Sequence, residues 1–430
     1  MKIKNIHIKN FKGIDDKVFL LNPHFTLFIG DNATGKTSIL DALAVSIGSF
    51  FIEMGIGIKT RTIQDHEIRT INTNGQARPQ LPVTILANGI INEKELSWKR
   101  EILKQKTTSK DAKTVSQLAQ KLMQKSRKGE NVVFPVFAYH GTGRLWAEHE
   151  KVGFQKQEEG IKMAYNNCLS AKSSSREFLE WYKTQEDSIL KFDQPSERAH
   201  LTAFKNTILA LIPDKRWQDM AFDRKQEELV GVFTDAAGQK HKLAYRQLSD
   251  GFRNIIGLVA DIAYRCIQLN PHLGEYAVAE TPGIVLIDEL DLHLHPNWQR
   301  HVVADLKRVF PKIQFVATTH SPFIVQSLAK DELINLDMDQ IGVETNPFNY
   351  GIEDVAEIEM GVDDVARSDA FKDRVNIASQ YYRLIAEGKN SKNDNELAEL
   401  RRQLNEMEER FSDDAAFVAT LKLEREASTL

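Results

Sequence analysis

Short runs of apolar residues recur along the chain, each bounded by polar or turn-forming residues. Such runs are typical of buried β-strands. Near the N-terminus they predict three strands, at 3–8, 18–21 and 25–29, separated by Lys12-Gly13 and Asn22-Pro23. Shorter runs at 83–86 and 90–91 predict further strands of a peripheral sheet. Three later runs, at 134–139, 284–287 and 313–318, are continuous enough to be buried on both faces, as in a parallel sheet.

Other stretches repeat their apolar residues with helical spacing. Residues 38–49 place an apolar face after the third strand, and residues 160–228 are helical in pattern, with a core stripe at 178–182. Near the C-terminus the apolar spacing is 3-4-3-4, which predicts a seam of about three heptads. The residues of this seam are Leu397, Leu400, Leu404, Met407 and Phe411, continued by Val418 and Leu421. The seam can pack on its own domain or on another subunit, and the pattern leaves both open.

Residues 30–37 form a complete phosphate-loop pattern, Gly-Asp-Asn-Ala-Thr-Gly-Lys-Thr, between a predicted strand and a predicted helix. The glycines let the backbone curl so that successive N–H groups point at one anion, and the helix start adds partial positive charge. The lysine of such a loop reaches the terminal phosphates, and its last hydroxyl binds Mg²⁺. The sequence therefore predicts an ATP site with Mg²⁺ held by Thr37. Its nucleotide-binding residues are Gly30, Asp31, Asn32, Ala33, Thr34, Gly35, Lys36, Thr37 and Ser38.

Three further segments with candidate chemistry follow in close order. Ser249 and Gly251 lie at a predicted helix start, where they can donate hydrogen bonds to a phosphate. Asp288 and Glu289 end a buried strand, and ligands of α/β folds bind at that edge of the sheet. We expect Asp288 to hold Mg²⁺ through water and Glu289 to orient or deprotonate the attacking water. His320, also at a strand end, is expected to sense the γ-phosphate.

Two other features have competing interpretations. Arg144, flanked by glycines just past a predicted strand, can approach a nucleotide or brace a turn. The spacing of His293 and His295 suggests a metal site, but no cysteine or third histidine stands at ligand spacing to complete it. The alternative is a loop that crosses a dimer interface beside Glu289.

The composition describes an ordinary water-soluble chain: 42% hydrophobic and 27% charged residues, with a net charge of −4. Two distant cysteines fit a reducing compartment, so we expect a cytoplasmic protein. No run approaches the roughly 18 apolar residues that span a bilayer, so we expect no membrane partner. Residues 94–128 hold eleven Lys or Arg against three acids, which fits a solvated helix face or a patch for nucleic acid or an acidic partner.

Taken in order, these motifs resemble the ABC-type ATPase heads of the SMC, RecF and OLD proteins. The resemblance is carried by the phosphate loop, the Leu-Ser-Asp-Gly signature, the Asp-Glu strand, the His-Leu-His-Pro loop and Thr-Thr-His-Ser-Pro. It covers residues 1–50 and 243–335 closely. Within this group the chain is most similar to the compact ATPases of anti-phage systems of the Septu type. Tyr-His-Gly-Thr-Gly-Arg-Leu-Trp at 139–146 supports that subgroup.

The chain also departs from these relatives. Asp250 and Phe252 replace a glycine and a glutamine of the transporter signature, which argues against a transporter subunit. Leu290 and Asp291 stand where many RecF and OLD relatives have Pro-Glu. For the glutamine that normally completes the Mg²⁺ shell, Gln64 is only a candidate. OLD-type nucleases carry a nuclease domain after the switch histidine, whereas only 110 residues follow His320 here.

The resemblance implies an α/β ABC-type P-loop ATPase head that is split by a helical insertion and followed by a helical C-terminal tail. We expect an N-terminal lobe at 1–140, the insertion at 141–230, a C-terminal lobe at 231–345 and a tail at 346–430 for assembly or partner binding. The implied function is an ATP-hydrolysing subunit of an anti-phage complex. It would act as a homodimer or larger oligomer and control a partner nuclease of the HNH type. The alternative is a RecF-like DNA-repair ATPase that binds nucleic acid.

Overall fold

The computed structural model describes residues 1–104, 106–144, 160–171, 176–192, 194–212, 216–338, 345–362, 369–386 and 395–410. The chain divides into two compact units, Met1–Val355 and Ala356–Leu430. Several sequence predictions fall outside the described residues: those for Leu145 and Trp146, and those for the end of the seam at Phe411, Val418 and Leu421. No helix among the described residues is both long and apolar enough to cross a bilayer.

A five-stranded parallel sheet forms the centre of the first unit. Its strand order is β15-β3-β14-β13-β9, and every neighbouring pair is parallel. All residues of these strands are buried, as their continuous apolar runs predict. Because the strands are parallel, their carboxyl ends meet at one edge. The bounds are β3 (Phe25–Ile29), β9 (Val136–His140), β13 (Gly283–Ile287), β14 (Ile313–Thr318) and β15 (Leu333–Asn335).

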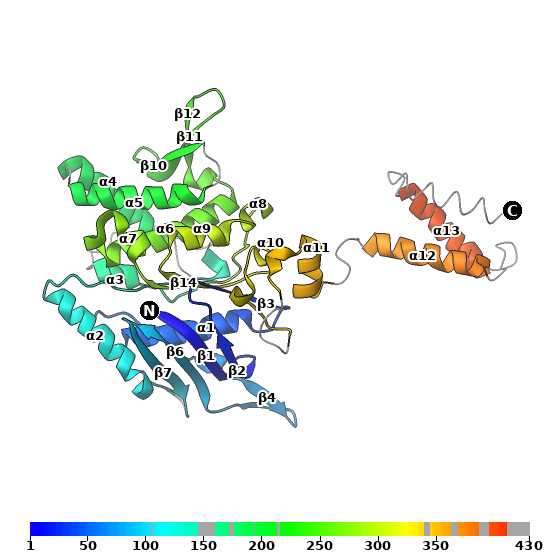
Figure 1. The fold of residues 1–430 in the computed structure, drawn as a ribbon, viewed down its shortest axis with the longest axis horizontal. Helices are drawn as coiled ribbons and strands as arrows, with labels where there is room; N and C mark the ends of the chain where they lie inside the picture. The colour runs from blue at the N-terminus through cyan, green and yellow to red at the C-terminus, as the bar shows by residue number, and fades with distance from the viewer. Residues whose placement is uncertain are drawn as a thin grey trace. The chain divides into compact units, whose positions relative to one another are not determined.

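A second, antiparallel sheet has the order β2-β1-β6-β7-β8. Helix α1 (Lys36–Ile47) contacts strands of both sheets and lies between them (Figure 1). The buried Gln314 side chain of β14 joins the sheets directly, since its amide exchanges two hydrogen bonds of 2.8 Å with the backbone of Ile3. The bounds are β1 (Lys2–Phe11), β2 (Ile14–Leu20), β6 (Val83–Ile91), β7 (Lys94–Ile102) and β8 (Thr107–Thr108); a separate hairpin pairs β4 (Thr70–Thr73) with β5 (Gln76–Pro79).

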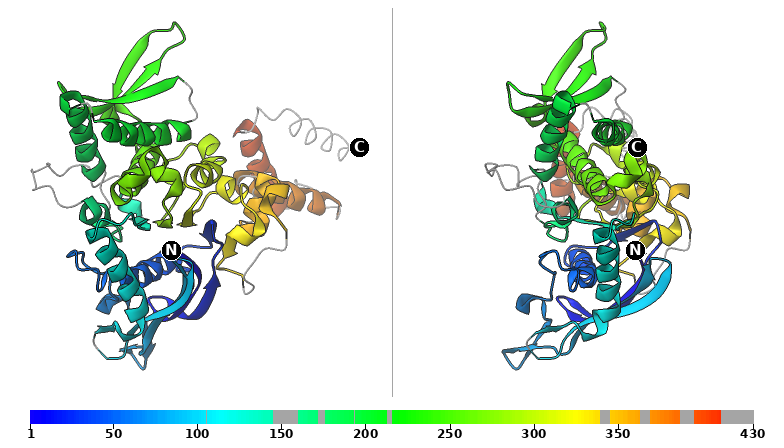
Figure 2. Two further views of the ribbon diagram at one scale, coloured as in Figure 1. Left: turned by 60° about the vertical axis from the view of Figure 1, so that its left-hand side comes forward. Right: turned by 90° about the vertical axis from the view of Figure 1, so that its left-hand side faces the viewer.

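Helices cover the face of the parallel sheet that α1 leaves open (Figures 1 and 2). The long helix α6 (Asp250–Leu269) packs on β9 and on α5 (Pro195–Leu211), which in turn contacts α4 (Arg176–Phe192). The signature therefore begins a helix that is buried along most of its length. The other helices are α2 (Lys113–Arg127), α3 (Gly160–Tyr165), α7 (Ala277–Glu280), α8 (Pro296–Gln299), α9 (Val302–Val309), α10 (Pro322–Val325) and α11 (Ile352–Asp354).

The prediction of helix throughout 160–228 is wrong at its C-terminal end. Residues from Trp217 onward form a three-stranded antiparallel sheet of β10 (Trp217–Asp223), β11 (Glu228–Thr234) and β12 (Lys240–Ala244), which projects beyond α4 and α5 (Figure 2). β10 is short and mostly not buried, so it carries little periodic signal that would distinguish it from a helix. Similarly, only part of the basic stretch 94–128 is helical, because its first nine residues form β7.

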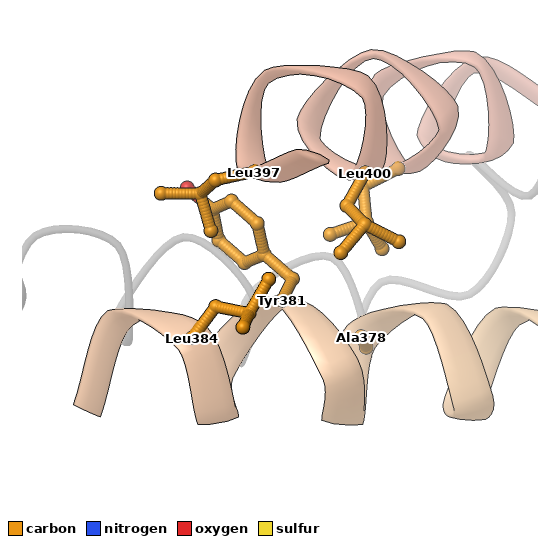
Figure 3. Packing of buried hydrophobic residues seen from close by; sticks show 6 residues of the cluster. Ala378, Tyr381, Leu384, Leu397 and Leu400 are labelled. Carbon is orange, nitrogen blue, oxygen red and sulfur yellow. The ribbon is translucent and has the colours of Figure 1, made fainter. Parts of the chain in front are cut away.

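The second unit contains a helical hairpin of α12 (Asp369–Ala386) and α13 (Asn395–Arg410). Its apolar side chains point toward one another from the two helices (Figure 3). The described part of the predicted seam is therefore buried within the chain's own hairpin rather than left open. The buried residues of this cluster are Ala378, Tyr381, Leu384, Leu397, Leu400 and Leu404.

Candidate functional site

The phosphate loop connects β3 to α1 at the carboxyl edge of the parallel sheet. Its backbone has the left-handed geometry that the glycine pattern predicts, with φ of 143° at Gly30, 103° at Gly35 and 70° at Ala33. Residues other than glycine adopt such backbone angles only at an energetic cost. The two glycines therefore allow the loop to curl. The curl brings the start of α1, whose first N–H groups lack intrahelical acceptors, to the sheet edge.

Lys36, the first residue of α1, is almost fully buried within this loop. Its ammonium donates hydrogen bonds to the carbonyl oxygens of Gly30, at 2.6 Å, and Asp31, at 2.8 Å. Desolvation lowers the pKa of Lys36 from its ordinary value, while Asp337 and Asp288 act in the opposite direction. A desolvated ammonium held by two neutral carbonyls fits a triphosphate, because a phosphate would supply the anionic partner that the loop itself lacks.

Thr37 and Asp288 come from distant parts of the chain and meet at this edge. The Thr37 hydroxyl donates to the Asp288 carboxylate, with an Oγ1–Oδ2 distance of 3.0 Å. The same carboxylate accepts a hydrogen bond of 2.7 Å from Thr318 at the end of β14. A hydroxyl beside a carboxylate is the oxygen donor set that Mg²⁺ prefers, so the residues present fit the metal that the loop pattern implies.

Glu289 directly follows Asp288 and has a left-handed backbone, with φ of 49°. Its N–H donates to the Thr318 hydroxyl at 2.8 Å, and its carbonyl accepts from the Arg144 guanidinium at 2.8 Å. Its side chain is half-buried. In the described part of the chain, no hydrogen bond engages the Glu289 carboxylate. The main chain is therefore fixed on both sides while the carboxylate stays available.

The segment after β14 is tied to the segment after β13. Asp291 accepts hydrogen bonds from the Thr319 hydroxyl, at 2.5 Å, and from the His320 backbone N–H, at 3.3 Å. The His320 side chain itself is exposed. Asp291, which departs from the Pro-Glu of many RecF and OLD relatives, thus holds the backbone from which His320 projects.

The signature residues lie at the N-terminus of α6. Ser249 is the exposed N-cap of this helix, and its hydroxyl makes no capping hydrogen bond. Gly251 packs so closely on the loop after β13 that a Cβ there would lie 2.4 Å from the His293 carbonyl oxygen. Phe252 contacts Trp217 of β10 and Trp298 of α8, with ring centroids 5.6 and 4.5 Å apart. Among the described residues, no hydrogen bond joins Ser249 or Gly251 to the phosphate loop of their own chain.

Two candidates have local structural roles. His295 caps α8, because its Nδ1 accepts a hydrogen bond of 3.2 Å from the Asn297 backbone. The amide of Gln64 donates to the carbonyl and hydroxyl oxygens of Thr62, with no described bond to Thr37 or Asp288. Neither geometry adds a ligand to the site.

Sequence patterns missed two residues that the structure places beside the loop. The Asp337 carboxylate, just after β15, accepts a hydrogen bond of 2.7 Å from the Asp31 backbone. Thr318 bridges Asp288 and Glu289 as described above. A signal existed for Asp337, since it follows the largely apolar segment Leu333-Ile334-Asn335-Leu336, as Asp288 follows its own strand. The hydroxyl of Thr318 is unremarkable in sequence, because threonine is common within strands.

Two family descriptions match the chain. Residues 5–215 match "AAA domain", and residues 151–326 match "AAA domain, putative AbiEii toxin, Type IV TA system". The Retron Vc95 probable ATPase of Vibrio cholerae serotype O1 biovar El Tor is 26% identical over 419 residues, covering 83% of this chain and 79% of that protein. Septu protein PtuA of Bacillus thuringiensis is 39% identical over 136 residues, covering 29% of this chain and 33% of that protein.

Among solved structures, the SMC head bound to the C-winged helix domain of ScpA is similar to the chain. The TM-score is 0.47 at 16% identity, with 78% of this chain and 94% of that chain covered.

Proposed function

We propose that this chain, whose motifs resemble those of PtuA, is an ABC-type ATPase and the ATP-controlled subunit of an anti-phage defence complex. The heads of two copies would engage around ATP and so control a partner nuclease of the HNH type. One observation carries the proposal: Thr37, Asp288 and Glu289 converge beside the phosphate loop, although 251 residues separate the first two. The similarity to Retron and Septu proteins supports the defence role.

Each residue of the cluster has a role in this proposal. The loop at 30–38 and the Lys36 ammonium bind the phosphates, and Thr37 and Asp288 hold Mg²⁺. Bound there, Mg²⁺ would supply charge neutralisation at the β- and γ-phosphates. Glu289 orients the attacking water, since its carboxylate is not engaged elsewhere in the described chain. His320 approaches the γ-phosphate from the neighbouring strand end.

The exposure of Ser249 supports the proposed dimer. A helix N-terminus favours an anion. The Ser249 hydroxyl makes no capping hydrogen bond, so it can donate to such an anion. Because neither Ser249 nor Gly251 bonds to the described phosphate loop of its own chain, we propose that they cap the ATP held by a second copy. Two such sites would then close together, which makes engagement of the heads depend on ATP.

We expect purified protein to leave DNA uncut in Mg²⁺ or Mn²⁺ with ATP, and to cut only with its partner nuclease. The reason is that the Asp288 carboxylate is already bonded to Thr37 and Thr318 at the ATP site. The measurement is a plasmid-cleavage assay on the chain alone and with the nuclease encoded beside it. Strong cutting by the isolated chain that persists in Lys36→Ala would contradict this function. Cutting by the pair that ignores the ATP state would contradict the proposed control.

The RecF-like alternative rests on the exposed face of α2. Lys113, Lys121 and Lys128 follow one another at about two-turn intervals, so they share one side of this helical segment. The 15 residues of α2 include no Asp or Glu. Such a row of cations suits a nucleic-acid backbone, whose binding releases counterions and therefore weakens with salt.

If the alternative holds, the triple variant Lys113→Glu, Lys121→Glu, Lys128→Glu should bind duplex DNA weakly. The slope of log K against log salt should decrease in magnitude by about 3, roughly one per lost phosphate contact. Fluorescence anisotropy at several salt concentrations measures this slope. A matched control reverses the charge of three exposed lysines elsewhere in the chain by substitution with glutamate: Lys191, Lys225 and Lys240. Equal slopes for both variants would exclude α2 as a DNA site and favour the first function.

A further inference from the structure

Arg144, in the loop after β9, is 8% exposed and forms hydrogen bonds around its whole guanidinium. Nη1 donates to the carbonyl oxygens of Gly141, at 3.1 Å, and Asp288, at 2.7 Å. Nη2 donates to the Glu289 carbonyl at 2.8 Å, and Nε donates to the side-chain oxygen of Asn254 at 2.5 Å. Burial lowers the pKa of Arg144 to about 10, so the group remains charged near neutral pH. The sequence left open whether this arginine approaches a nucleotide or braces a turn, and these contacts are those of a brace.

What Arg144 braces is the strained backbone of Glu289. A non-glycine residue in the left-handed region is strained and persists only where its surroundings enforce it. Here the Thr318 hydroxyl holds the N–H of Glu289, and Arg144 holds its carbonyl oxygen. The direction of the Glu289 side chain follows from this backbone conformation. Removing either contact would therefore allow the carboxylate to change its direction.

Asn254 connects this brace to the signature helix. It is 4% exposed in the second turn of α6, and its amide is used at both ends. The oxygen accepts from Arg144, and the nitrogen donates to the Leu292 carbonyl. Nearby, Gly251 lies against the His293 carbonyl. The first turns of α6 are thus attached to the loop after Glu289 and, through Arg144, to Glu289 itself.

We propose that Arg144 and Asn254 are positioning residues that couple the start of α6 to the direction of the Glu289 carboxylate. The inference rests on the proposed role of Glu289 as the residue that orients water. A phosphate that binds at Ser249 would act on the first turn of α6, and this pair would relay that change to the hydrolytic residue of the same head. Binding of a phosphate at Ser249 would then be linked to the orientation of water by Glu289 in the same head.

The test is to measure kcat and ATP affinity in Arg144→Lys, Asn254→Ala and the double variant. Lysine keeps the charge but has no planar fork to contact Asn254 and the two carbonyls together. We expect kcat to fall by about 10- to 100-fold, since small misplacements cost that much. The ATP dissociation constant should stay nearly unchanged. Arg308→Lys, on the exposed side of α9, is the matched control.

The double variant identifies coupling, because residues that act as one unit have non-additive effects. The kcat of the double variant should therefore resemble that of the less active of the two single variants. Wild-type turnover in Arg144→Lys, or a double loss equal to the product of the single losses, would overturn the pairing. So would a parallel loss of ATP affinity and melting temperature in both single variants, which would indicate only a structural role. Glu289→Gln in the same assays separates the two proposals. Normal turnover in Glu289→Gln would contradict the proposed function. Slow turnover in Glu289→Gln together with normal turnover in the Arg144 and Asn254 variants would contradict only the coupling.

Discussion

Replacing Lys36 with alanine is expected to weaken ATP binding by at least about 30-fold. Among the described residues, its buried ammonium donates hydrogen bonds to two neutral carbonyls of the loop, so its charge is available to a phosphate. Truncating one partner of a buried, hydrogen-bonded charge pair costs about 2–5 kcal/mol, and each 1.4 kcal/mol is a factor of ten. Isothermal titration with ATP on dilute protein measures the change. Lys17→Ala, on the exposed side of β2, controls for the loss of one positive charge.

Ser249→Arg provides the contrasting variant. If Ser249 caps the ATP of a second head, a bulky arginine there should prevent head engagement but leave binding to a single head intact. Titration on dilute protein should then match the wild type, while light scattering with ATP should show no ATP-dependent dimer. Equal loss of affinity in Lys36→Ala and Ser249→Arg would contradict the arrangement across two heads. ATP-dependent dimers of Ser249→Arg would contradict it as well.

Four of the five strands of the central sheet, all except the three-residue β15, could be predicted from sequence because they are buried on both faces. Such strands need continuous apolar runs, and each of the runs at 25–29, 284–287 and 313–318 became a strand of the parallel sheet. Parallel strands also place their ends at one edge, so the meeting of Thr37 with Asp288 followed from the motif positions. Where topology alone determines proximity, sequence patterns are sufficient.

The remaining features depend on contacts that no local pattern encodes. Arg144 and Asn254 are 110 residues apart and meet because α6 packs on β9. Thr318 could not be distinguished from other strand threonines until Asp288 and Glu289 lay beside it. The sheet of β10 to β12 was missed for a different reason, since short half-exposed strands carry little periodic signal.

The two positive-φ residues after β13 illustrate how the site departs from local preference. Glu289 and His293 both adopt left-handed conformations that their side chains disfavour. The bonds that enforce the Glu289 conformation come from β14 and from the loop after β9, so the strain is maintained by tertiary structure. Strain of this kind concentrates at functional sites, and here it lies on the residue assigned to orient water.

Glu289→Gln is expected to bind ATP normally but to hydrolyse it about 10²–10⁴ times more slowly, the usual cost of removing a general base. Folding should be retained, because both hydrogen bonds that fix Glu289 come from its backbone and glutamine keeps them. ATP would then persist between the heads, so dimers should accumulate. Phosphate release and light scattering with ATP measure the two effects.

Two variants sharpen this test of Glu289. Glu280→Gln removes an exposed carboxylate of α7 that pairs with Lys312, and it should hydrolyse at the wild-type rate. Asp288→Asn should differ from Glu289→Gln, since it removes the charge that Thr37 and Thr318 contact and weakens Mg²⁺-dependent binding itself. Wild-type turnover in Glu289→Gln would remove this residue from the chemistry. A variant that hydrolyses ATP at the normal rate but forms no dimer would instead separate hydrolysis from head engagement. ATP control of a partner would then need another mechanism.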